Sequence, residues 1–491
     1  MAVMSMAAVL KMHADADPDR PMITCEGHSI SRRDFDLSTN RLARAYQALG
    51  VGEDDLVTIA LPNGIEFYQA AVATWKLGAT PQPVSAKLPD AELQAIVELA
   101  KPALIVGTAR AVVGGRAHVA EGFVPAPDLS PEISDAPLPD RITRHWKAPT
   151  SGGSTGRPKL IVAKSPAAFD PDAPFMGMTL GQTQLVPGPL YHNAPFSLSM
   201  IGLSRGHHLV VMKRFDPQEA LALIEEHRVG WVLMVPTMMS RISRLAPEVR
   251  ARFDVSSIET LWHMAAPCPA WLKQAWIDWL GPEKIWELYG GTEAQGTTLI
   301  RGDEWLAHKG SVGKPLDLFD MKILGENGQV LPAGEIGEIY MRPKAGAGTT
   351  YHYVGAEARA TNDGFESLGD LGWFDADGYL YIADRRTDMI LCGGANVYPA
   401  EVEAAIDAHP NVRSSAVIGL PDDDLGNRVH AIVDCFAPMD AEELIAFVGT
   451  QVARYKVPRS VEFVTEPVRD DAGKVRRSEL RRVRLEAGVV G

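Results

Sequence analysis

The sequence is poor in the features that several protein classes need. Its four cysteines lie far apart, with no CxxC pair and no zinc-finger spacing, which indicates reduced thiols rather than a disulfide framework. It has no run of about 18 or more apolar residues, and charged residues soon interrupt its short apolar start, so we expect neither a membrane span nor a secretion signal. The acidic balance, 48 Lys and Arg against 62 Asp and Glu, argues against a nucleic-acid partner. We therefore expect a cytoplasmic protein.

What the sequence does contain is an alternation of helical and strand-like patterns. With 46% hydrophobic and 22% charged residues over 491 positions, the composition is that of a globular protein of several domains. Residues 31–49 fit a capped amphipathic helix, 56–60 a short strand and 64–77 another helix, and the rhythm recurs at 216–235 and 270–288. This predicts an α/β fold with large, helix-covered, mostly parallel sheets.

The pattern changes twice toward the end of the chain. From about residue 310, short strands broken by Gly-rich turns predict a small β-barrel-like subdomain over 310–384, within an N-terminal domain of residues 1–386. Residues 387–491 are expected to form a small α+β C-terminal domain. Its helices are expected at 399–408 and 441–453, and its strands at 416–419 and 431–436.

The most informative stretch runs from Ser151 to Lys159 and packs three glycines and three hydroxyls into its first six residues. Such a loop can wrap phosphates with backbone N–H groups and hydroxyls. It is not a Walker A loop, because Arg and Pro follow Gly156. It satisfies the G-x-S-x-G pattern of serine hydrolases with Ser154 as nucleophile, but that elbow needs a following helix, and the residues from Lys159 onward fit a strand. Phosphate binding is therefore favoured over hydrolysis and over a merely flexible loop.

Three further stretches carry residues suited to nucleotide chemistry. The strand that ends in Tyr289-Gly-Gly-Thr-Glu293 offers an aromatic ring for stacking on a base and a carboxylate for Mg²⁺. Asp370 can accept hydrogen bonds from ribose hydroxyls and Arg385 can donate to them. Lys474 lies on a glycine-containing turn. Each stretch alone is weak, since a strand before a glycine turn is commonly structural and a charged turn is commonly just solvated.

In this order and at these separations, the stretches resemble the adenylate-forming superfamily: acyl-CoA synthetases, firefly luciferase and the adenylation domains of peptide synthetases. The resemblance covers nearly the whole chain. It implies a nucleotide site built from the phosphate loop, an adenine-contacting segment, the Tyr-Gly-x-Thr-Glu motif and the ribose-binding pair. The residues so implied are Ser151, Ser154, Thr155, Gly156, Lys159, Ala265, Ala266, Pro267, Tyr289, Gly290, Asp370 and Arg385.

The resemblance also implies a two-step reaction that uses ATP, Mg²⁺ and coenzyme A. A carboxylate attacks the α-phosphorus of ATP to give acyl-AMP and pyrophosphate, and a thiol then displaces AMP. The protein contributes positioning and electrostatic stabilisation. Thr292 would contact the α-phosphate, Glu293 would hold Mg²⁺, and Lys474 would bridge the carboxylate and the α-phosphate.

In the family the C-terminal domain is mobile and turns about a hinge that follows the ribose arginine. Here the hinge position is Thr387, generally Asp or Lys in the family, and Asp384 replaces the glycine that usually precedes the arginine. The implied rotation withdraws Lys474 and presents the loop of Gly393 and Gly394 to the thiol. Both departures make the rotation less secure than the adenylation.

The acid is expected to bind beside His192, within a segment that matches the motif at the mouth of the family's acyl pocket; a core or capping histidine is the alternative. Ser197 stands where peptide-synthetase domains place an Asp for the α-amine, which disfavours amino acids. The segment and the Asp-Arg-Arg-Thr-Asp stretch resemble the bile-acid and steroid CoA ligase branch more than the long-chain branch. Further pocket candidates are mostly apolar and bulky: Val235, Pro236, Met238, Met239, Trp262, His263 and Met264, with Gly291.

The sequence thus predicts an ATP-dependent carboxylic acid:CoA ligase for a hydrophobic acid, whether aromatic, alicyclic, steroid-like or fatty. An adenylating enzyme that passes its acyl group to an amine or to a separate carrier protein remains open. A non-catalytic nucleotide-binding regulator is a third alternative, which the retention of Lys474 and Glu293 disfavours. The expected partner is a small carboxylic acid, and the oligomeric state, a homodimer included, is left open.

Overall fold

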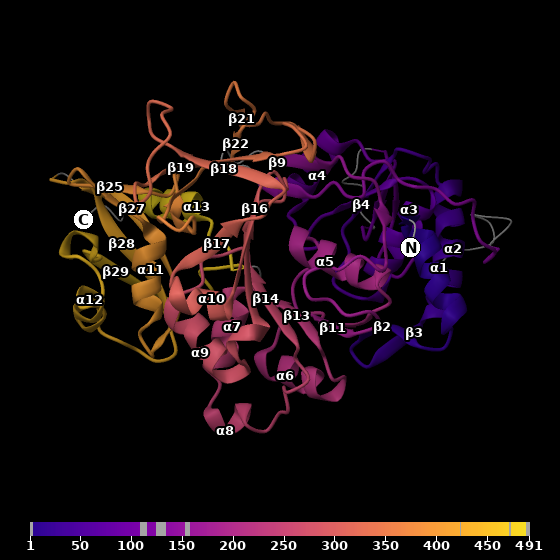
Figure 1. Ribbon diagram of the computed structural model, residues 1–491, viewed down its shortest axis with the longest axis horizontal. Coiled ribbons are helices and arrows are strands. Elements are labelled where there is room, and N and C mark those ends of the chain that lie inside the picture. The colour runs from indigo at the N-terminus through magenta and orange to yellow at the C-terminus, as the bar shows by residue number, and fades with distance from the viewer. Residues whose placement is uncertain are drawn as a thin grey trace.

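The chain forms one broad body with its first helices at one end and its C-terminal elements at the other (Figure 1). The structure is a computed structural model that describes residues 3–108, 115–123, 134–152, 158–422, 424–470 and 473–487, with the backbone alone at 151 and 152. Within these ranges, none of the helices has the length and apolar character needed to span a membrane.

Among the described residues the largest sheet has 15 strands, and its middle is parallel. In the parallel part the strands are buried on both faces, as the fully buried run of residues 231–234 shows, because helices cover both sides. The prediction of a helix-covered, mostly parallel sheet is confirmed here. In spatial order the parallel strands are β2 (Pro21–Cys25), β12 (His208–Val211), β11 (Thr183–Val186), β13 (Trp231–Met234), β14 (Thr260–Met264) and β15 (Ile285–Gly290), with β3 (His28–Ser31) antiparallel at the β2 edge.

Helices pack on the two faces of this sheet according to the alternation of its strands. Val232 and Met234 face one side and join the core beneath α6, α7 and α9, whereas Trp231 and Leu233 face the other side and join Leu198 of α5. The two faces therefore have separate apolar cores. These helices are α5 (Asn193–Ser204), α6 (Pro217–Glu226), α7 (Pro236–Ser243) and α9 (Ala270–Leu280), with the short α8 (Pro247–Arg250) and α10 (Gly302–Ala307) beside them.

Antiparallel strands continue the sheet beyond β15 into the predicted β-rich residues 310–384. The continuity depends on Gly313 in β17, where φ is +98° and a Cβ would lie 1.9 Å from the carbonyl oxygen of Leu299. Most of these residues thus form one end of the large sheet. Their strands are β16 (Thr297–Arg301), β17 (Ser311–Pro315), β18 (Phe319–Leu324), β19 (Gly337–Pro343), β21 (Arg359–Ala360), β22 (Glu366–Ser367), β23 (Asp370–Phe374) and β24 (Leu380–Arg385).

Smaller sheets complete the N-terminal part. The helices and strand predicted at 31–49, 56–60 and 64–77 are present as α2 (Arg32–Ala48), β4 (Leu56–Ile59) and α3 (Ile65–Lys76). Ser31 caps α2, because its hydroxyl accepts the Asp34 N–H. The remaining elements are α1 (Met6–Ala16), α4 (Asp90–Ala100), the parallel strands β5 (Thr80–Pro83), β6 (Leu104–Val106) and β7 (Ala117–Val119) beside β4, the pair β1 (Met4–Ser5) and β10 (Ala168–Phe169), and the antiparallel sheet of β8 (Thr150–Gly152), β9 (Pro158–Ala163) and β20 (Tyr351–Val354).

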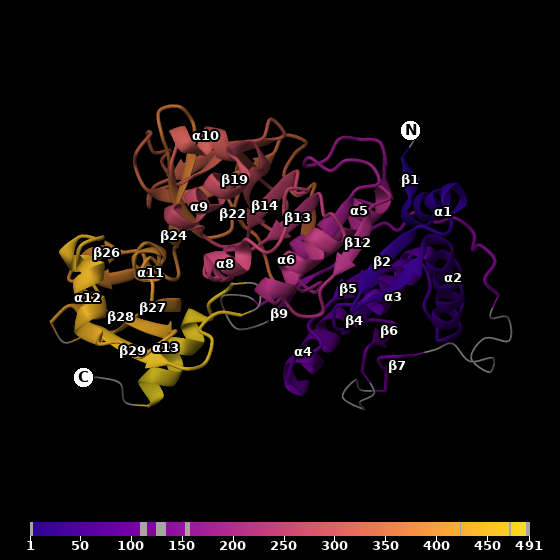
Figure 2. The same ribbon diagram turned by 90° about the horizontal axis from the view of Figure 1, so that it is seen from below.

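The C-terminal domain is the predicted α+β unit, and Figure 2 shows it beside the large part and far from the N-terminal helices. The two short strands expected at 416–419 and 431–436 are parts of a much longer hairpin, β27 (Val412–Asp422) and β28 (Gly426–Cys435), and the second strand ends one residue earlier than expected. Its other elements are β25 (Ile390–Cys392), β26 (Ala395–Val397), α11 (Pro399–Asp407), α12 (Ala441–Gly449), β29 (Ser460–Val464) and α13 (Arg477–Glu486); two 3-10 helices span Pro282–Lys284 and Arg454–Lys456.

Candidate active site

A cleft of about 2400 Å³ lies between the large sheet and the C-terminal domain. Because the carboxyl ends of parallel strands meet at one edge of a sheet, the residues that follow β13, β14 and β15 converge on this cleft. Lys474 enters it from the C-terminal domain. The sequence-predicted residues that line it at the strand ends are Val235, Pro236, Ala265, Ala266, Pro267, Gly291, Thr292 and Glu293.

The turns after β14 and β15 are tightly shaped. A Cβ on Gly291 would lie 2.6 Å from the end of the Leu368 side chain and 2.8 Å from Glu293 Oε2, so a larger residue here would crowd both side chains. Ala265 adopts a φ of +73°, a left-handed conformation that an alanine rarely adopts and that stores strain beside a site. The backbone here is held in one particular shape rather than left as a loose loop.

Three predicted residues meet at the carboxyl end of β15. The Tyr289 hydroxyl donates to Asp370 Oδ2 over 2.8 Å, and Arg385 Nε lies 3.5 Å from Asp370 Oδ1. The register of β23 and β24 pairs Asp370 directly with Arg385. Burial raises the pKa of Asp370, while Arg385 and Tyr289 act in the opposite direction. The result is a carboxylate and a guanidinium side by side, an arrangement that can accept from and donate to adjacent hydroxyl groups.

Glu293 is held by two side chains from the small sheet of β8, β9 and β20. Tyr353 donates its hydroxyl to Glu293 Oε1 over 2.6 Å, and Lys159 Nζ lies 3.6 Å from the same oxygen. Lys159 also sits 3.9 Å from the centre of the Tyr353 ring, within the range of a cation–π contact. Sequence analysis missed Tyr353, although the alternation of Tyr351 and Tyr353 on a short strand places both rings on one face.

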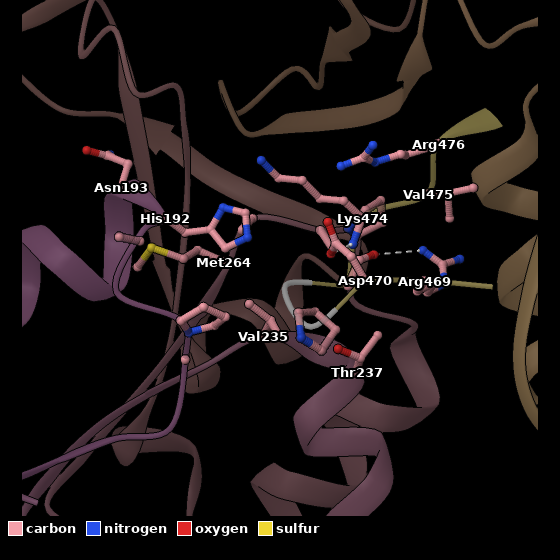
Figure 3. Close-up of a pocket in the computed structure, with 18 of the residues that line it drawn as sticks. His192, Asn193, Val235, Thr237, Met264, Arg469, Asp470, Lys474, Val475 and Arg476 are labelled. Atoms are coloured by element: carbon pink, nitrogen blue, oxygen red, sulfur yellow. Dashed lines mark hydrogen bonds between the residues drawn. The ribbon is translucent and has the colours of Figure 1, made fainter. Parts of the chain in front are cut away.

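The turn that carries Lys474 is closed by hydrogen bonds to Asp470. The Gly473 N–H donates to the Asp470 carbonyl over 2.9 Å, and the Lys474 N–H donates to Asp470 Oδ1 over 2.8 Å. Gly473 has a φ of +76°, and a Cβ there would lie 3.1 Å from Thr237, so the turn rests on the start of α7. Figure 3 shows Lys474 and His192 facing the same cavity from opposite sides.

Lys474 has an exposed face toward the cleft, yet protein surrounds much of its side chain. This burial lowers the pKa of Lys474, and the positive charge of Arg385 lowers it further, while Asp470 and Glu293 oppose the shift. Arg385, Glu293 and Lys474 are therefore close enough to act on one another. Residues from three separate segments converge here.

Both ends of α11, a helix of the C-terminal domain, are bonded to the large part of the protein. The Asp384 carboxylate accepts the Ala400 N–H over 2.7 Å, and Arg244 donates to the Asp407 carbonyl over 2.8 Å, where a cation is favoured at a helix end. Burial raises the pKa of Asp384 to about 6. The predicted hinge residue Thr387 is exposed between these contacts and lines the cleft.

The acyl side of the cleft is largely apolar. His192 precedes α5 and lines the cleft, with its ring centre 4.3 Å from that of Tyr191. Leu198 of α5 and Leu233 of β13 form walls that sequence analysis did not single out. Both residues lie in apolar elements, a helix and a strand. Many core residues lie in such elements too, so the sequence alone does not mark these two as pocket residues.

Three predicted pocket residues do not line the cleft within the described ranges. His263 points to the opposite face of β14 from its neighbours, where it is fully buried beside Glu287. Met239 packs into the core beneath α7. Trp262 stacks on Trp286 with ring centres 5.2 Å apart and donates its indole N–H to the Met176 carbonyl, so it supports the pocket from behind. Trp231 donates to the same carbonyl.

The phosphate loop lies mostly outside the described residues. Ser151 is described as part of strand β8, by its backbone alone. The positions of the remaining predicted contacts in the loop fall outside the described ranges: Ser154, Thr155 and Gly156.

Gly393 and Gly394 form the turn of the β25–β26 hairpin and are not among the residues that line the cleft in the described chain. Both have positive φ, +56° and +79°, which explains the glycine pair. The Gly393 N–H donates to the Leu425 carbonyl over 2.9 Å. In this arrangement of the domains the turn takes no part in the cleft that holds Lys474.

The sequence profile of the AMP-binding enzyme family matches residues 10–353, and that of the AMP-binding enzyme C-terminal domain matches residues 401–474. The chain belongs to the AMP-binding enzyme family. In this AMP-binding enzyme the first matched segment supplies Glu293 and the second ends on Lys474, so the cleft lies between the two matched parts.

Relatives of this AMP-binding enzyme act on different acids. The feruloyl-CoA synthase of an Amycolatopsis species is 32% identical over 486 residues, which cover 96% of this chain and 97% of that protein. A Mycobacterium tuberculosis propanoyl:CoA ligase, named for a methyl-dioxo-octahydroindenyl group, is 29% identical with 94% and 96% covered. The ATP-bound structure of MatB from Rhodopseudomonas palustris superposes with a TM-score of 0.80 at 26% identity, covering 98% and 99% of the two chains. The protein is an AMP-forming acid–CoA ligase, and the similarity to these relatives does not identify the acid on which it acts.

Proposed function

We propose that the protein activates a hydrophobic carboxylic acid as its acyl-AMP, releasing pyrophosphate, and then transfers the acyl group to coenzyme A, releasing AMP. One observation carries the proposal. Lys474, Glu293 and the Asp370–Arg385 pair come from separate segments of the chain and line a single cleft. A protein that only bound nucleotides would not need a lysine brought in from a second domain.

The cleft fits ATP as substrate. Asp370 and Arg385 lie side by side, 3.5 Å apart, and suit the two ribose hydroxyls. Tyr289 is held by its bond to Asp370, with its ring at the edge of the cleft where a base can stack. The strained backbone at Ala265 supports the predicted adenine contact, because it fixes the direction of the neighbouring carbonyl and N–H groups.

The residues also fit Mg²⁺. Glu293 Oε1 is bonded to Tyr353 and Lys159, which turns Oε2 toward the turn of Gly291. Mg²⁺ commonly takes one or two carboxylates together with substrate phosphates and water. Among the described residues no group of three or more acidic, His or Cys side chains could form a complete metal cage, which suits a site completed by ATP. The metal would neutralise part of the negative charge of the phosphates, and Glu293 would hold the metal in position.

In the first step, Lys474 would bring one positive charge to the carboxylate and the α-phosphate. Negative charge builds on the phosphate oxygens as the acid's oxygen attacks and pyrophosphate departs, so a compact ammonium at this point stabilises the transition state. Lys159 Nζ lies 3.6 Å from Glu293 Oε1 and would interact with the departing phosphates. His192 faces Lys474 across the cavity, at the mouth of the acyl pocket.

The acid would lie between α5 and the sheet, against Leu198, Leu233 and Met264. These apolar walls favour a hydrophobic acid, whether aromatic, alicyclic, steroid-like or fatty. For the second step we propose that the bonds at Asp384 and Arg244 break as the C-terminal domain turns about Thr387. This rotation would withdraw Lys474 from the cleft and bring the Gly393–Gly394 turn of the β25–β26 hairpin into its place.

The test is direct. The purified protein is incubated with ATP, Mg²⁺ and a panel of carboxylic acids, with and without coenzyme A, and the products are identified by mass. We expect acid-dependent pyrophosphate and acyl-AMP without coenzyme A, and an acyl-CoA with it. Acyl-AMP that forms but passes only to added amines or carrier proteins would contradict the CoA step. Absence of pyrophosphate with every acid would contradict the proposal as a whole.

A further inference from the structure

A buried carboxylate lies behind the turn that carries Lys474, and the proposed function does not use it. Glu403 is on the buried face of α11 and is only 4% exposed. A carboxylate that has left water is strongly destabilising unless cations and hydrogen-bond donors surround it. Glu403 therefore needs partners, and its partners show which part of the chain it holds.

Two arginines pair with this carboxylate. Arg469 Nη2 donates to Glu403 Oε2 over 2.7 Å, and Arg477 Nη2 donates to both carboxylate oxygens over 2.8 Å. The Val417 N–H donates to Oε1 over 2.8 Å. Arg469 precedes Lys474 by five residues, and Arg477 follows it by three. One buried carboxylate thus holds the chain on both sides of this lysine.

Arg469 also bonds to the turn itself. Its other terminal nitrogen, Nη1, donates to the Gly473 carbonyl over 3.2 Å, and Figure 3 shows Arg469 beside the turn, on the side away from His192. The same peptide group carries the Lys474 N–H, which donates to Asp470 Oδ1 over 2.8 Å. Because a peptide group is planar, hydrogen bonds at both of its polar atoms fix its orientation. The direction in which the Lys474 side chain leaves the backbone is fixed with it.

Arg477 connects the same cluster to the hinge. Its Nη1 donates to Asp388 Oδ2 over 2.8 Å, and both side chains are mostly buried. Asp388 directly follows Thr387, the predicted hinge residue. Charge-assisted hydrogen bonds therefore join α11, the turn of Lys474 and the first residue after the hinge. A rotation about Thr387 would move these parts as one piece.

We propose that Glu403 is a positioning residue for acyl-AMP formation, which acts through Arg469 and Arg477 to fix the turn that carries Lys474. It touches neither ATP nor the acid. Its effect is geometric, because the lysine ammonium ends a flexible four-carbon stem, and a displacement of about 1 Å can cost about 100-fold in rate. The inference rests on the proposed function, since it explains how the lysine of the first step is held.

The experiment measures the two half-reactions separately in the full-length protein, with the acid that the wild type adenylates best. Acyl-AMP formation is followed as single-turnover pyrophosphate release without coenzyme A, and thioester formation is followed from synthetic acyl-AMP with coenzyme A. Arg469→Gln should slow acyl-AMP formation about 10- to 100-fold and leave the apparent affinity for ATP and the rate of thioester formation unchanged. Glu403→Gln should show the same selective loss.

Two further variants separate positioning from stability. Arg469→Lys keeps the charge opposite Glu403, but a single ammonium lacks the fork that reaches a carboxylate and a carbonyl together, so its rate should lie between those of the wild type and Arg469→Gln. Arg484→Gln is the matched control, because Arg484 of the same domain also bonds a carboxylate and a backbone carbonyl, those of Glu462 and Leu480. Arg484 is buried and, in the described chain, is not among the residues that line the cleft. This control should keep both half-reactions.

A folding defect would lower both half-reactions, because the Gly393–Gly394 turn lies in the same domain. Equal losses in the two half-reactions of Arg469→Gln, an unchanged rate of acyl-AMP formation, or an equal loss in Arg484→Gln would each overturn the inference and leave the proposed function intact. Should Arg469→Gln or Glu403→Gln not fold, the comparison of Arg469→Lys with Arg484→Gln decides the question.

Failure of the proposed function gives a different result. If the wild type releases no pyrophosphate with any acid, the proposed function fails and this inference fails with it. If the wild type makes acyl-AMP but no thioester, only the coenzyme A step fails, and the rates of acyl-AMP formation in Arg469→Gln and Arg484→Gln still decide the role of Glu403.

Discussion

Replacing Tyr353 with phenylalanine is expected to raise the Mg²⁺ concentration that half-saturates pyrophosphate release. The Tyr353 hydroxyl donates to Glu293 Oε1 over 2.6 Å, and Glu293 is only 6% exposed, so this bond fixes a nearly buried carboxylate. A hydrogen bond to a charged group contributes about 1.5 to 3 kcal/mol, or about 10- to 150-fold in a binding constant. Lys159 stays 3.6 Å from the same oxygen and keeps part of the restraint. We therefore expect the lower end, about tenfold.

The assay is a Mg²⁺ titration of acid-dependent pyrophosphate release at saturating ATP and acid. Tyr351→Phe is the matched control: Tyr351 lies on the same face of β20, 4.8 Å from the Tyr353 ring, but its hydroxyl donates to Glu366. Its Mg²⁺ requirement should stay near that of the wild type. An unchanged or lowered requirement in Tyr353→Phe, or an equal change in both variants, would refute the role of Tyr353 in positioning Glu293.

Four other changes, at three positions, test the rest of the site. Lys474→Ala should slow acyl-AMP formation about 100- to 1000-fold while sparing thioester formation from supplied acyl-AMP, and Lys456→Ala should change neither rate. Burial lowers the pKa of Lys474, so as the pH rises this lysine loses its charge at a lower pH than an ordinary lysine does. Lys474→Arg should therefore shift the alkaline fall of the adenylation rate to higher pH. Equal pH profiles for the two proteins would contradict this. Arg244→Ala should slow acyl-AMP formation about tenfold without weakening ATP binding, since it frees one end of α11; weaker ATP binding would argue for a different role. Ala265→Gly relieves a φ of +73° and should raise the melting temperature by about 1 to 2 °C, whereas a lower value would mean that the methyl group packs.

The fold was predictable because its signals are local. The helix at 31–49 has a capping serine and an apolar stripe, and the buried strand at 231–235 has an uninterrupted apolar run, so each element is visible without knowledge of its neighbours. The full length of the β27–β28 hairpin was not visible, since polar residues, a proline and a glycine interrupt its outer parts, and pairing between the two strands keeps them extended.

The site was predictable where a motif marked it, and not where only packing decides. His263 and Met264 are adjacent in sequence, but the alternation of β14 sends them to opposite faces, and nothing in the sequence says which face the cleft occupies. Tyr353 reaches Glu293 only because β20 pairs with β9, a contact between residues far apart in the chain. The bond from Asp384 to Ala400 likewise exists only once α11 has docked.

The shared carbonyl of Met176 has an optical consequence. Trp231 and Trp262 both donate their indole N–H groups to it, and Trp262 is stacked on Trp286 behind the wall of the acyl pocket. The three indoles belong to the same apolar cluster as Met264, which lines the cleft, so an acid bound against Met264 changes their surroundings. Intrinsic fluorescence should therefore report acid binding without a label and without turnover, which separates acids that enter the pocket from acids that are merely not adenylated.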